Sequence, residues 1–260
     1  MNRVLLIDAD ILVYQVATSV EVPIDWGDDL WTLHSNFGEA KDKIDGMIAD
    51  IKESLDVDSV HRLVFALTTT QMNFRKNVYA KYKSNRKAVR KPLVWKPLRD
   101  YLKQNFVVFE KDNLEGDDCL GILATKSGPV VKGTAAGDER IIVSIDKDFK
   151  TIPCAYYHMK DREIRHISEG EADRYFMTQT LTGDTTDGYP GCPGIGPKSA
   201  EKVLEGCTTI AEMWPKVVEA YKAKGLGEGV AIQMARCARI LRASDYDFKN
   251  KKPILWGPPV

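Results

Sequence analysis

Short clusters of acidic residues, each at the end of an apolar run, are the feature of this 260-residue chain that most constrains its fold. The run VLLIDAD carries Asp8 and Asp10, and the run IIVSIDKD carries Asp146 and Asp148. A short apolar run is typical of a buried strand, and an acid just after such a strand lies at the carboxyl edge of a sheet. Carboxylates gathered at one edge repel one another unless cations hold them. The pattern therefore predicts a site for Mg²⁺ or Mn²⁺.

Two further clusters, LEGDD at residues 114–118 and TGDTTD at residues 182–187, extend this pattern. An isolated acid after a strand is more often a turn residue or a helix cap, and Asp10 fits that description. Asp117 and Asp118 could be first-turn acids favoured by a helix dipole. Four separate clusters nevertheless favour metal binding. The predicted ligands are Asp8, Glu115, Asp117, Asp118, Asp146, Asp148, Asp184 and Asp187.

Apolar runs that alternate with helical patterns predict an α/β fold, with a mostly parallel central sheet flanked by helices. The strand candidates are Val4–Ile7, Leu63–Leu67, Phe106–Phe109 and Ile141–Ile145. The helix candidates are residues 39–56, 115–126 and 228–243. We predict an α/β core at residues 1–179 and a helical region at residues 180–260.

Composition narrows the class of protein further. No run of about eighteen apolar residues occurs, so we expect no membrane-spanning helix. The N-terminus lacks the basic region and cleavage site of a signal peptide. The five cysteines are scattered without a C-x-x-C pair, which indicates free thiols in a reducing cytoplasm.

The formal net charge is +0, but the charges are unevenly distributed. Residues 71–103 contain eleven Lys or Arg and a single acid, and we expect this basic segment to be too polar for the core. Such a segment beside an acidic site suits a polyanionic substrate. Lys83 and Arg86 could meet phosphates while Phe74, Tyr79 and Tyr82 stack on unpaired bases. A solvated basic face is the plainer alternative.

A glycine-rich turn precedes a helical pattern in GCPGIGPKSAEKV, residues 191–203. Such a turn exposes backbone N–H groups to an anion, and Lys198 and Lys202 add positive charge. The alternative is a flexible loop before a solvated helix. We favour a clamp on duplex phosphates that does not read the bases.

Five motifs together resemble the 5′ nuclease family, which includes flap endonucleases and the 5′ nuclease domains of DNA polymerases. They are LLIDAD, FRKNVYAKYKSNR, LEGDD, SIDKDF and GDTTDGYPGCPGIGPKSA. KSNRKAVRKP and QMARCARILRASDYDF are most similar to the 5′→3′ exonucleases of short-tailed bacteriophages. The resemblance spans nearly the whole chain.

The resemblance implies a PIN/5′ nuclease-like core, a basic helical arch at about residues 71–103, and a helix–three-turn–helix module that grips duplex DNA. It implies two Mg²⁺ or Mn²⁺ ions and a K⁺ ion bound by the turn at Gly191–Gly196. Lys83, Arg86 and Asp146 are the implied catalytic residues. The implied DNA contacts are Arg75, Lys76, Tyr79, Lys81, Tyr82, Lys83, Arg86, Gly194, Gly196, Lys198, Ser199 and Lys202.

One departure from the family concerns the end of the second strand, where an Asp is usual. Here Thr68, Thr69 and Thr70 occupy that neighbourhood. The change could weaken one metal position, or Asp10 or a water could replace the missing carboxylate.

The resulting hypothesis is a monomeric, metal-dependent 5′→3′ nuclease acting at 5′ ends, flaps or nicks of duplex DNA. A phage origin would place it in the host cytoplasm, in DNA replication, primer removal or recombination. One alternative is a protein that binds branched DNA without cutting it. Another is a nuclease directed at RNA, for which an RNA–DNA hybrid would present a suitable duplex.

Overall fold

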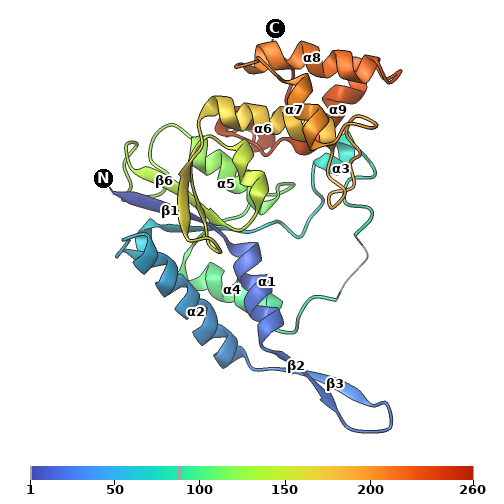
Figure 1. The fold of residues 1–260 in the computed structure, drawn as a ribbon. Helices are drawn as coiled ribbons and strands as arrows, with labels where there is room; N and C mark the ends of the chain where they lie inside the picture. Colours follow the sequence, from blue (N-terminus) through green and yellow to red (C-terminus); the bar gives the residue numbers. More distant parts are fainter. Residues whose placement is uncertain (1, 87–89, 260) are drawn as a thin grey trace.

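A six-stranded sheet forms the centre of the protein, whose computed structural model describes residues 2–86 and 90–259 (Figure 1). In spatial order the strands are β5 (Val107–Phe109), β4 (Leu63–Ala66), β1 (Arg3–Asp8), β6 (Glu139–Ser144), β7 (Ala155–His158) and β8 (Glu163–His166). The first five run parallel to their neighbours, and β8 pairs antiparallel with β7. The predicted, mostly parallel sheet is confirmed.

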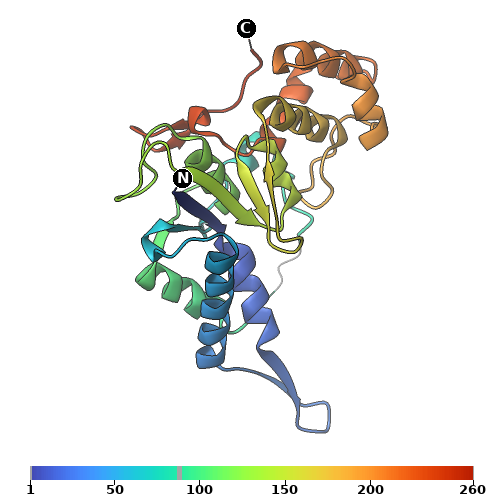
Figure 2. The same ribbon diagram turned by 60° about the vertical axis from the view of Figure 1, so that its left-hand side comes forward.

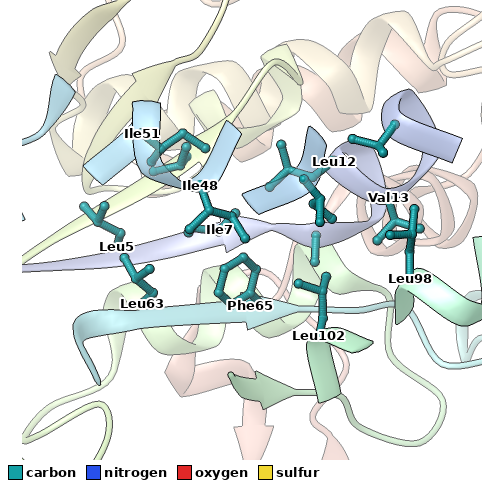
Figure 3. Packing of buried hydrophobic residues seen from close by; sticks show 14 of the residues in the cluster. Leu5, Ile7, Leu12, Val13, Ile48, Ile51, Leu63, Phe65, Leu98 and Leu102 are labelled. Carbon is teal, nitrogen blue, oxygen red and sulfur yellow. The ribbon is translucent and has the colours of Figure 1, made fainter. Parts of the chain in front are cut away.

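The central strands are apolar throughout because both faces of the sheet are covered. Leu5 and Ile7 of β1 pack into one hydrophobic cluster, whereas Val4 and Leu6 face a second cluster on the other side. Figure 3 shows the first cluster, in which Phe65 of β4 lies beside Ile7 and Leu63 lies beside Leu5.

Three helices cover this first face: α1 (Ala9–Ser19), α2 (Phe37–Ser54) and α4 (Trp95–Asn105). The helix predicted at residues 39–56 corresponds to α2, and it buries Ile44 and Ile48 at helical spacing. The side chain of Asn36 accepts a hydrogen bond from the Glu39 amide at 3.2 Å, which caps the start of α2.

The expectation that the basic segment at residues 71–103 lies wholly outside the core is wrong. Its last part forms α4, whose Leu98 and Leu102 are fully buried against the sheet. A spacing of four residues places both on one helical face, while Lys96 and Lys103 are exposed. Before α4, helical structure in the described part of the segment is limited to α3 (Arg75–Val78), and residues 87–89 lie outside the description.

Helix α5 (Gly116–Thr125) covers the opposite face of the sheet. Four more helices pack around their own apolar cluster: α6 (Glu169–Thr182), α7 (Pro197–Val203), α8 (Ile210–Lys222) and α9 (Glu228–Ala238) (Figure 2). The predicted boundary between residues 179 and 180 falls inside α6. The division into two regions stays a prediction, with α6 contributing to both.

Helix α9 ends at Ala238, five residues before the end of the predicted helix at 243. Ile240 and Leu241 leave the helical path and pack into the cluster that α5 shares with the sheet. Arg242 follows them and donates to Asp173 of α6 at 2.7 Å. Tertiary packing therefore overrides the helical pattern here.

The remaining elements are short. Strands β2 (Glu21–Asp25) and β3 (Trp31–Ser35) form a hairpin that projects from the body of the protein (Figure 1). A small ladder and three 3₁₀ turns complete the fold: β9 (Tyr246–Asp247), β10 (Lys252–Pro253), η1 (Val60–Arg62), η2 (Lys147–Thr151) and η3 (Ala243–Asp245). Every helix in the described part of the chain is too short or too polar to cross a membrane.

Candidate active site

Acids from three separate parts of the chain meet at the carboxyl edge of the sheet. Asp8 is the last residue of β1, and Asp146 follows the neighbouring strand β6 by two residues. Glu115 and Asp117 belong to the start of α5. These four carboxylates and Asp10 line one cavity of about 1010 Å³, which we call the acidic pocket. The predicted convergence at the sheet edge is thus what the structure displays for these residues.

Ser144, at the end of β6, links two of these acids and was missed by the sequence reasoning. Its hydroxyl donates to Asp8 Oδ2 at 2.7 Å and accepts from the Asp146 amide at 3.1 Å. Asp8 also accepts from the Ile11 amide at 3.3 Å and so caps α1. The helix-cap role considered for Asp10 belongs instead to Asp8.

Burial and repulsion between neighbouring acids disfavour ionisation of Asp8 and Asp117. Burial raises the pKa of Asp8 to about 7, and the charges of Asp10 and Asp146 add to the effect. Burial, together with the charges of Asp8 and Asp146, raises the pKa of Asp117 well above its usual range. Asp8 and Asp117 therefore favour a bound cation, because a nearby positive charge lowers the cost of ionising them.

A second group of acids lies beside the first, formed by Asp148, Asp184 and Asp187. Asp148 Oδ1 accepts a hydrogen bond from Gln179 Nε2 at 2.7 Å. Burial raises the pKa of Asp148 to about 7, and the charges of Asp146 and Asp184 reinforce that shift. Asp184 Oδ1 accepts from the Asp187 amide at 3.1 Å. Asp146 influences Asp8 as well as Asp148, so it lies electrostatically between the two groups.

Lys83 and Arg86 approach these acids from the basic segment. The Lys83 ammonium forms a short ion pair with Glu115 Oε1 and lies 3.6 Å from Asp187 Oδ2. Arg86 Nη2 pairs with Asp187 Oδ1 at 2.6 Å. Although burial opposes it, the charge of Lys83 helps to lower the pKa of Glu115. Both cations predicted to contact phosphate therefore line the acidic pocket.

Arg75 and Asp118 form a buried ion pair, which replaces the roles predicted for both. Arg75 Nη1 and Nη2 donate to the two carboxylate oxygens of Asp118 at 2.8 and 2.6 Å. Asp118 is fully buried and also accepts from the Leu241 amide at 3.1 Å. Neither side chain faces the pocket. The predictions that Arg75 contacts DNA and Asp118 binds metal are therefore corrected, because each satisfies the other inside the fold.

Tyr82 likewise does not offer an open stacking face. It is 2% exposed, and its hydroxyl lies 2.9 Å from Asp187 Oδ2 and 3.1 Å from Glu115 Oε2. The prediction that it stacks on a base is corrected accordingly. The aromatic residues that do line the acidic pocket are Tyr14 and Trp95. They escaped the sequence reasoning because both lie outside the Tyr-rich run.

Lys91 joins these two rings at the mouth of the pocket. Its ammonium lies 5.9 Å from the centroid of the Tyr14 ring and 5.3 Å from that of Trp95. Tyr14 is 46% exposed. Two aromatic faces and a cation on one wall suit an unpaired nucleotide. Among the other predicted DNA contacts of the basic segment, Lys76 and Lys81 are exposed and Tyr79 is half-buried.

The glycine-rich turn before α7 is well defined. A Cβ on Gly191, whose φ is +65°, would lie 2.3 Å from the Gly183 amide nitrogen, so glycine is required at this close approach. Gly194, Gly196, Lys198, Ser199 and Lys202 are all exposed. Helix α7 has seven residues, so the lysines supply more of the positive field than its dipole does. Lys224 Nζ, 3.7 Å from the position of a Cβ on Gly194, adds a cation that the sequence reasoning missed.

Thr68 follows β4 by two residues, at the position where the family usually carries an Asp. Its amide donates to Asp10 Oδ2 at 2.7 Å, and its hydroxyl accepts from the Gly116 amide at 2.9 Å. Asp10 Oδ1 accepts from Arg99 Nη1 at 2.6 Å. Asp10 therefore occupies the neighbourhood of the missing carboxylate, but both of its oxygens have protein donors.

The donor set fits a divalent cation, although the side chains are not in a coordinating arrangement. Within residues 2–86 and 90–259, no three Asp, Glu, His or Cys side chains are grouped so that they could hold an ion as they stand. The Lys83 ammonium already neutralises Glu115 and Asp187. The all-oxygen carboxylate chemistry and the raised pKa values of Asp8 and Asp148 match Mg²⁺ or Mn²⁺.

Comparison with known proteins agrees with this geometry. A family model described as "5'-3' exonuclease, N-terminal resolvase-like domain" matches residues 3–175. The exonuclease of Escherichia phage T7 is 30% identical, over 98% of this chain and 93% of the phage protein. The flap endonuclease Xni of Shewanella halifaxensis is 31% identical, over 64% of this chain and 68% of that protein.

A solved structure of the bacteriophage T5 flap endonuclease, described as a pseudo-enzyme-product complex with DNA and metal ions, has a similar fold. The TM-score is 0.67, at 14% sequence identity, over 92% of this chain and 89% of that chain. At such low identity the likeness concerns the fold alone. The family model covers most of the chain and the phage T7 relative nearly all of it, so this protein belongs to the 5′-3′ exonuclease family of nucleases.

Proposed function

We propose that this nuclease hydrolyses DNA phosphodiesters in the 5′→3′ direction with divalent metal ions, at 5′ ends, flaps or nicks of duplex DNA. The observation that carries the proposal is the acidic pocket itself. One wall presents Asp8, Glu115, Asp117 and Asp146, while Lys83, Arg86 and Lys91 belong to the same cavity. A site that joins carboxylates with several basic side chains suits a phosphate held between metal ions and positive charges.

Two ions are proposed, one for each group of acids. Asp8, Glu115, Asp117 and Asp146 would hold the first, and Asp148, Asp184 and Asp187 would hold the second with Asp146 between them. A bound Mg²⁺ or Mn²⁺ ion lowers the pKa of a coordinated water and neutralises charge on the phosphate. The chain's own part is to orient these carboxylates through Ser144 and the cap of α1.

Lys83 and Arg86 are proposed as catalytic residues that meet the scissile phosphate. Both pair with carboxylates that belong to the metal groups, so each lies within reach of a phosphate held there. Their positive charges would stabilise the negative charge that develops on the phosphoryl oxygens. Tyr14 and Trp95 would stack on an unpaired nucleotide next to that phosphate.

We propose that the turn before α7 binds the duplex at a distance from the scissile phosphate. Gly194, Gly196, Lys198, Ser199 and Lys202 are exposed together with Lys224, which suits contact with backbone phosphates but not with bases. Lys76, Tyr79 and Lys81 would contact the strand near the basic segment. A K⁺ ion at the carbonyls of Gly191–Gly196 is part of the same proposal.

The phage T7 relative, named an exonuclease, supports a role in phage DNA replication, primer removal or recombination, in the cytoplasm of the host. A monomer is proposed, and an RNA–DNA hybrid is a second possible substrate because it also presents a duplex backbone. Residue 68 is Thr where the family usually carries an Asp. This departure favours a second candidate function, namely DNA binding without cutting.

Cleavage of 5′-labelled duplex, flap and RNA–DNA hybrid substrates, with Mg²⁺ or with EDTA, tests the proposal. We expect Mg²⁺-dependent products from the DNA substrates and none with EDTA. Asp146→Asn should bind duplex DNA as the wild type does and cut it at least ~10²-fold more slowly. Asp50→Asn, an exposed acid on α2, is the matched control. Tight binding without cleavage by the wild type would support the non-cutting alternative and overturn the proposal.

A further inference from the structure

We infer that Asp10 and Thr68 are positioning residues that hold the first turn of α5, and thereby set where the carboxylates of Glu115 and Asp117 lie. The inference rests on the proposed function, in which these two carboxylates bind metal. Asp10 belongs to α1, Thr68 follows β4, and Gly116 begins α5. Three elements that are distant in the sequence therefore meet at one polar cluster.

Asp10, Thr68 and Arg99 form a closed ring of hydrogen bonds. The Thr68 amide donates to Asp10 Oδ2 at 2.7 Å, and Arg99 Nη1 donates to Asp10 Oδ1 at 2.6 Å. Arg99 Nη2 closes the ring by donating to the Thr68 carbonyl at 2.7 Å. Arg99 is 4% exposed and also reaches Glu110 Oε1 at 3.2 Å, so the ring is anchored in α4 and in the residue after β5.

The ring reaches α5 through the Thr68 side chain. The Gly116 amide donates to Thr68 Oγ1 at 2.9 Å. The first amides of a helix have no acceptor within the helix, so the Thr68 hydroxyl caps α5 from another element. The Thr69 amide adds a second link by donating to the Leu114 carbonyl at 3.3 Å. Glu115 and Asp117 flank Gly116 in the chain, so a shift of this turn moves both.

The packing around Gly116 leaves little room for a side chain. A Cβ atom there would lie 3.1 Å from Asp10 Oδ2 and 3.4 Å from the Thr68 amide nitrogen. Both partners are fixed by the ring and cannot retreat freely. Glycine thus lets α5 begin directly against the Asp10 carboxylate.

The competing role for Asp10 is that of a metal ligand, since it lines the acidic pocket. Each of its carboxylate oxygens already accepts a strong hydrogen bond, one of them from a buried guanidinium. A carboxylate committed in this way orients its neighbours more readily than it coordinates an ion. Geometry therefore favours positioning.

The test compares Thr68→Val, Thr68→Ser and the control Thr125→Val. Valine has the shape of threonine but offers no acceptor to Gly116, whereas serine keeps the hydroxyl. Thr125 Oγ1 accepts a similar backbone hydrogen bond, from the Ala243 amide at 2.7 Å, at the far end of the same helix. The measurements are Mn²⁺ binding without DNA by electron paramagnetic resonance, single-turnover cleavage with saturating DNA, and the melting temperature.

We expect Thr68→Val to weaken Mn²⁺ binding and slow single-turnover cleavage by about tenfold each, because small misplacements of reacting groups are costly. Thr68→Ser should stay within about twofold of the wild type in both. Thr125→Val should lower the melting temperature as much as Thr68→Val does but leave Mn²⁺ affinity unchanged.

Wild-type Mn²⁺ affinity in Thr68→Val, with only a lower melting temperature, would show a purely structural role and overturn the inference. A second overturning result is the loss of one Mn²⁺ ion in Asp10→Asn while Thr68→Val binds normally, which would make Asp10 a ligand. If the wild type itself neither binds Mn²⁺ nor cuts DNA, the proposed function fails, and the positioning role falls with it.

Discussion

Neighbouring acids in the first turn of α5 have opposite environments, one facing the core and the others facing the acidic pocket. On the core side, Asp118 is fully buried and is held by both outer nitrogens of Arg75, at 2.6 and 2.8 Å. On the pocket side, Glu115 pairs with Lys83, while Asp117 has a raised pKa. The same LEGDD motif therefore supplies one acid to the fold and two acids to the site.

Asp118 and Glu115 differ in the basic residue with which each forms its shortest ion pair. Arg75 is 2% exposed and also donates to the Cys237 and Arg239 carbonyls, so its position is fixed by the interior. Lys83 lies on a turn, with a φ of +54°, in which its flexible side chain can exchange one anion for another. Arg75 also lies 3.6 Å from Glu115 Oε2, but both of its short contacts to a carboxylate go to Asp118. The short contacts to the buried arginine make Asp118 structural, whereas the lysine at the cavity leaves Glu115 able to bind something else.

Among the substitutions that test this comparison, Asp117→Asn should have the largest effect. We expect cutting to fall by ~10²–10³-fold, because a carboxylate proposed to hold metal is lost. The metal-free protein should become more stable, since the raised pKa of Asp117 reflects burial and repulsion from Asp8 and Asp146. Single-turnover cleavage and urea denaturation in EDTA measure the two effects. Cutting at the wild-type rate would remove Asp117 from the site.

On the core side, Asp118→Ala should have the opposite effect: it should change stability more than metal binding. Removing Asp118 leaves the buried Arg75 guanidinium with only the more distant Glu115 carboxylate, 3.6 Å away, which should lower the free energy of unfolding by about 3–5 kcal/mol. The molecules that stay folded should bind as many Mn²⁺ ions as the wild type, but more weakly, because Asp118 Oδ2 also accepts from the Glu115 amide at 3.1 Å and so helps to hold the turn. Urea denaturation and Mn²⁺ titration at low temperature provide the measurements. A stable variant that has lost an ion would restore the ligand role predicted from the sequence.

The sequence alone could not separate these two sides. The apolar runs ending in acids predicted the sheet and placed Asp8, Asp146 and the start of α5 at one edge. This was possible because buried strands that alternate with helices leave a local and repeated pattern in the sequence. Whether Asp118 faces inward depends on Arg75, 43 residues earlier in the chain. No local pattern reports that pairing.

Two other predictions failed for the same physical reason. The density of Lys and Arg hid Leu98 and Leu102, whose spacing of four residues marks α4 as a helix that covers the sheet. The Tyr-rich run suggested stacking by Tyr82, but distant acids take up its hydroxyl and the ring is buried. Charge and aromatic content indicate a kind of ligand, whereas burial is decided by the rest of the chain.

Lys83→Met, which removes the ion pair between Lys83 and Glu115, should have an intermediate effect, on Mn²⁺ affinity. The Lys83 ammonium competes with a metal ion for Glu115 and Asp187, so its removal should tighten Mn²⁺ binding without DNA by about threefold to tenfold. Cutting should nevertheless slow, because the phosphate loses a cation. Calorimetric titration measures the affinity.

Lys91→Met is the matched control for this experiment. Lys91 lines the same pocket but lies over the Tyr14 and Trp95 rings and not beside a carboxylate, so its loss should leave Mn²⁺ affinity unchanged. Weaker Mn²⁺ binding in Lys83→Met than in Lys91→Met would mean that Lys83 supports the ion and does not compete with it.

The smallest effect is a pH dependence confined to the pocket side. The pKa values of Asp8 and Asp148 are raised from 3.8 to about 7 in the folded protein. Their protonated forms therefore favour the folded state below pH 4, and this contribution is lost as the pH rises from about 4 through about 7. Divalent ions displace those protons and reverse the loss.

The melting temperature measured in EDTA should accordingly fall between pH 5 and pH 7.5, while the gain produced by Mg²⁺ should grow over the same interval. Asp8→Asn should flatten both trends, because the amide does not titrate. A Mg²⁺ gain that is equal at pH 5 and pH 7.5 would mean that the pocket carboxylates are already ionised without metal, and the contrast between the two sides of α5 would then rest on geometry alone.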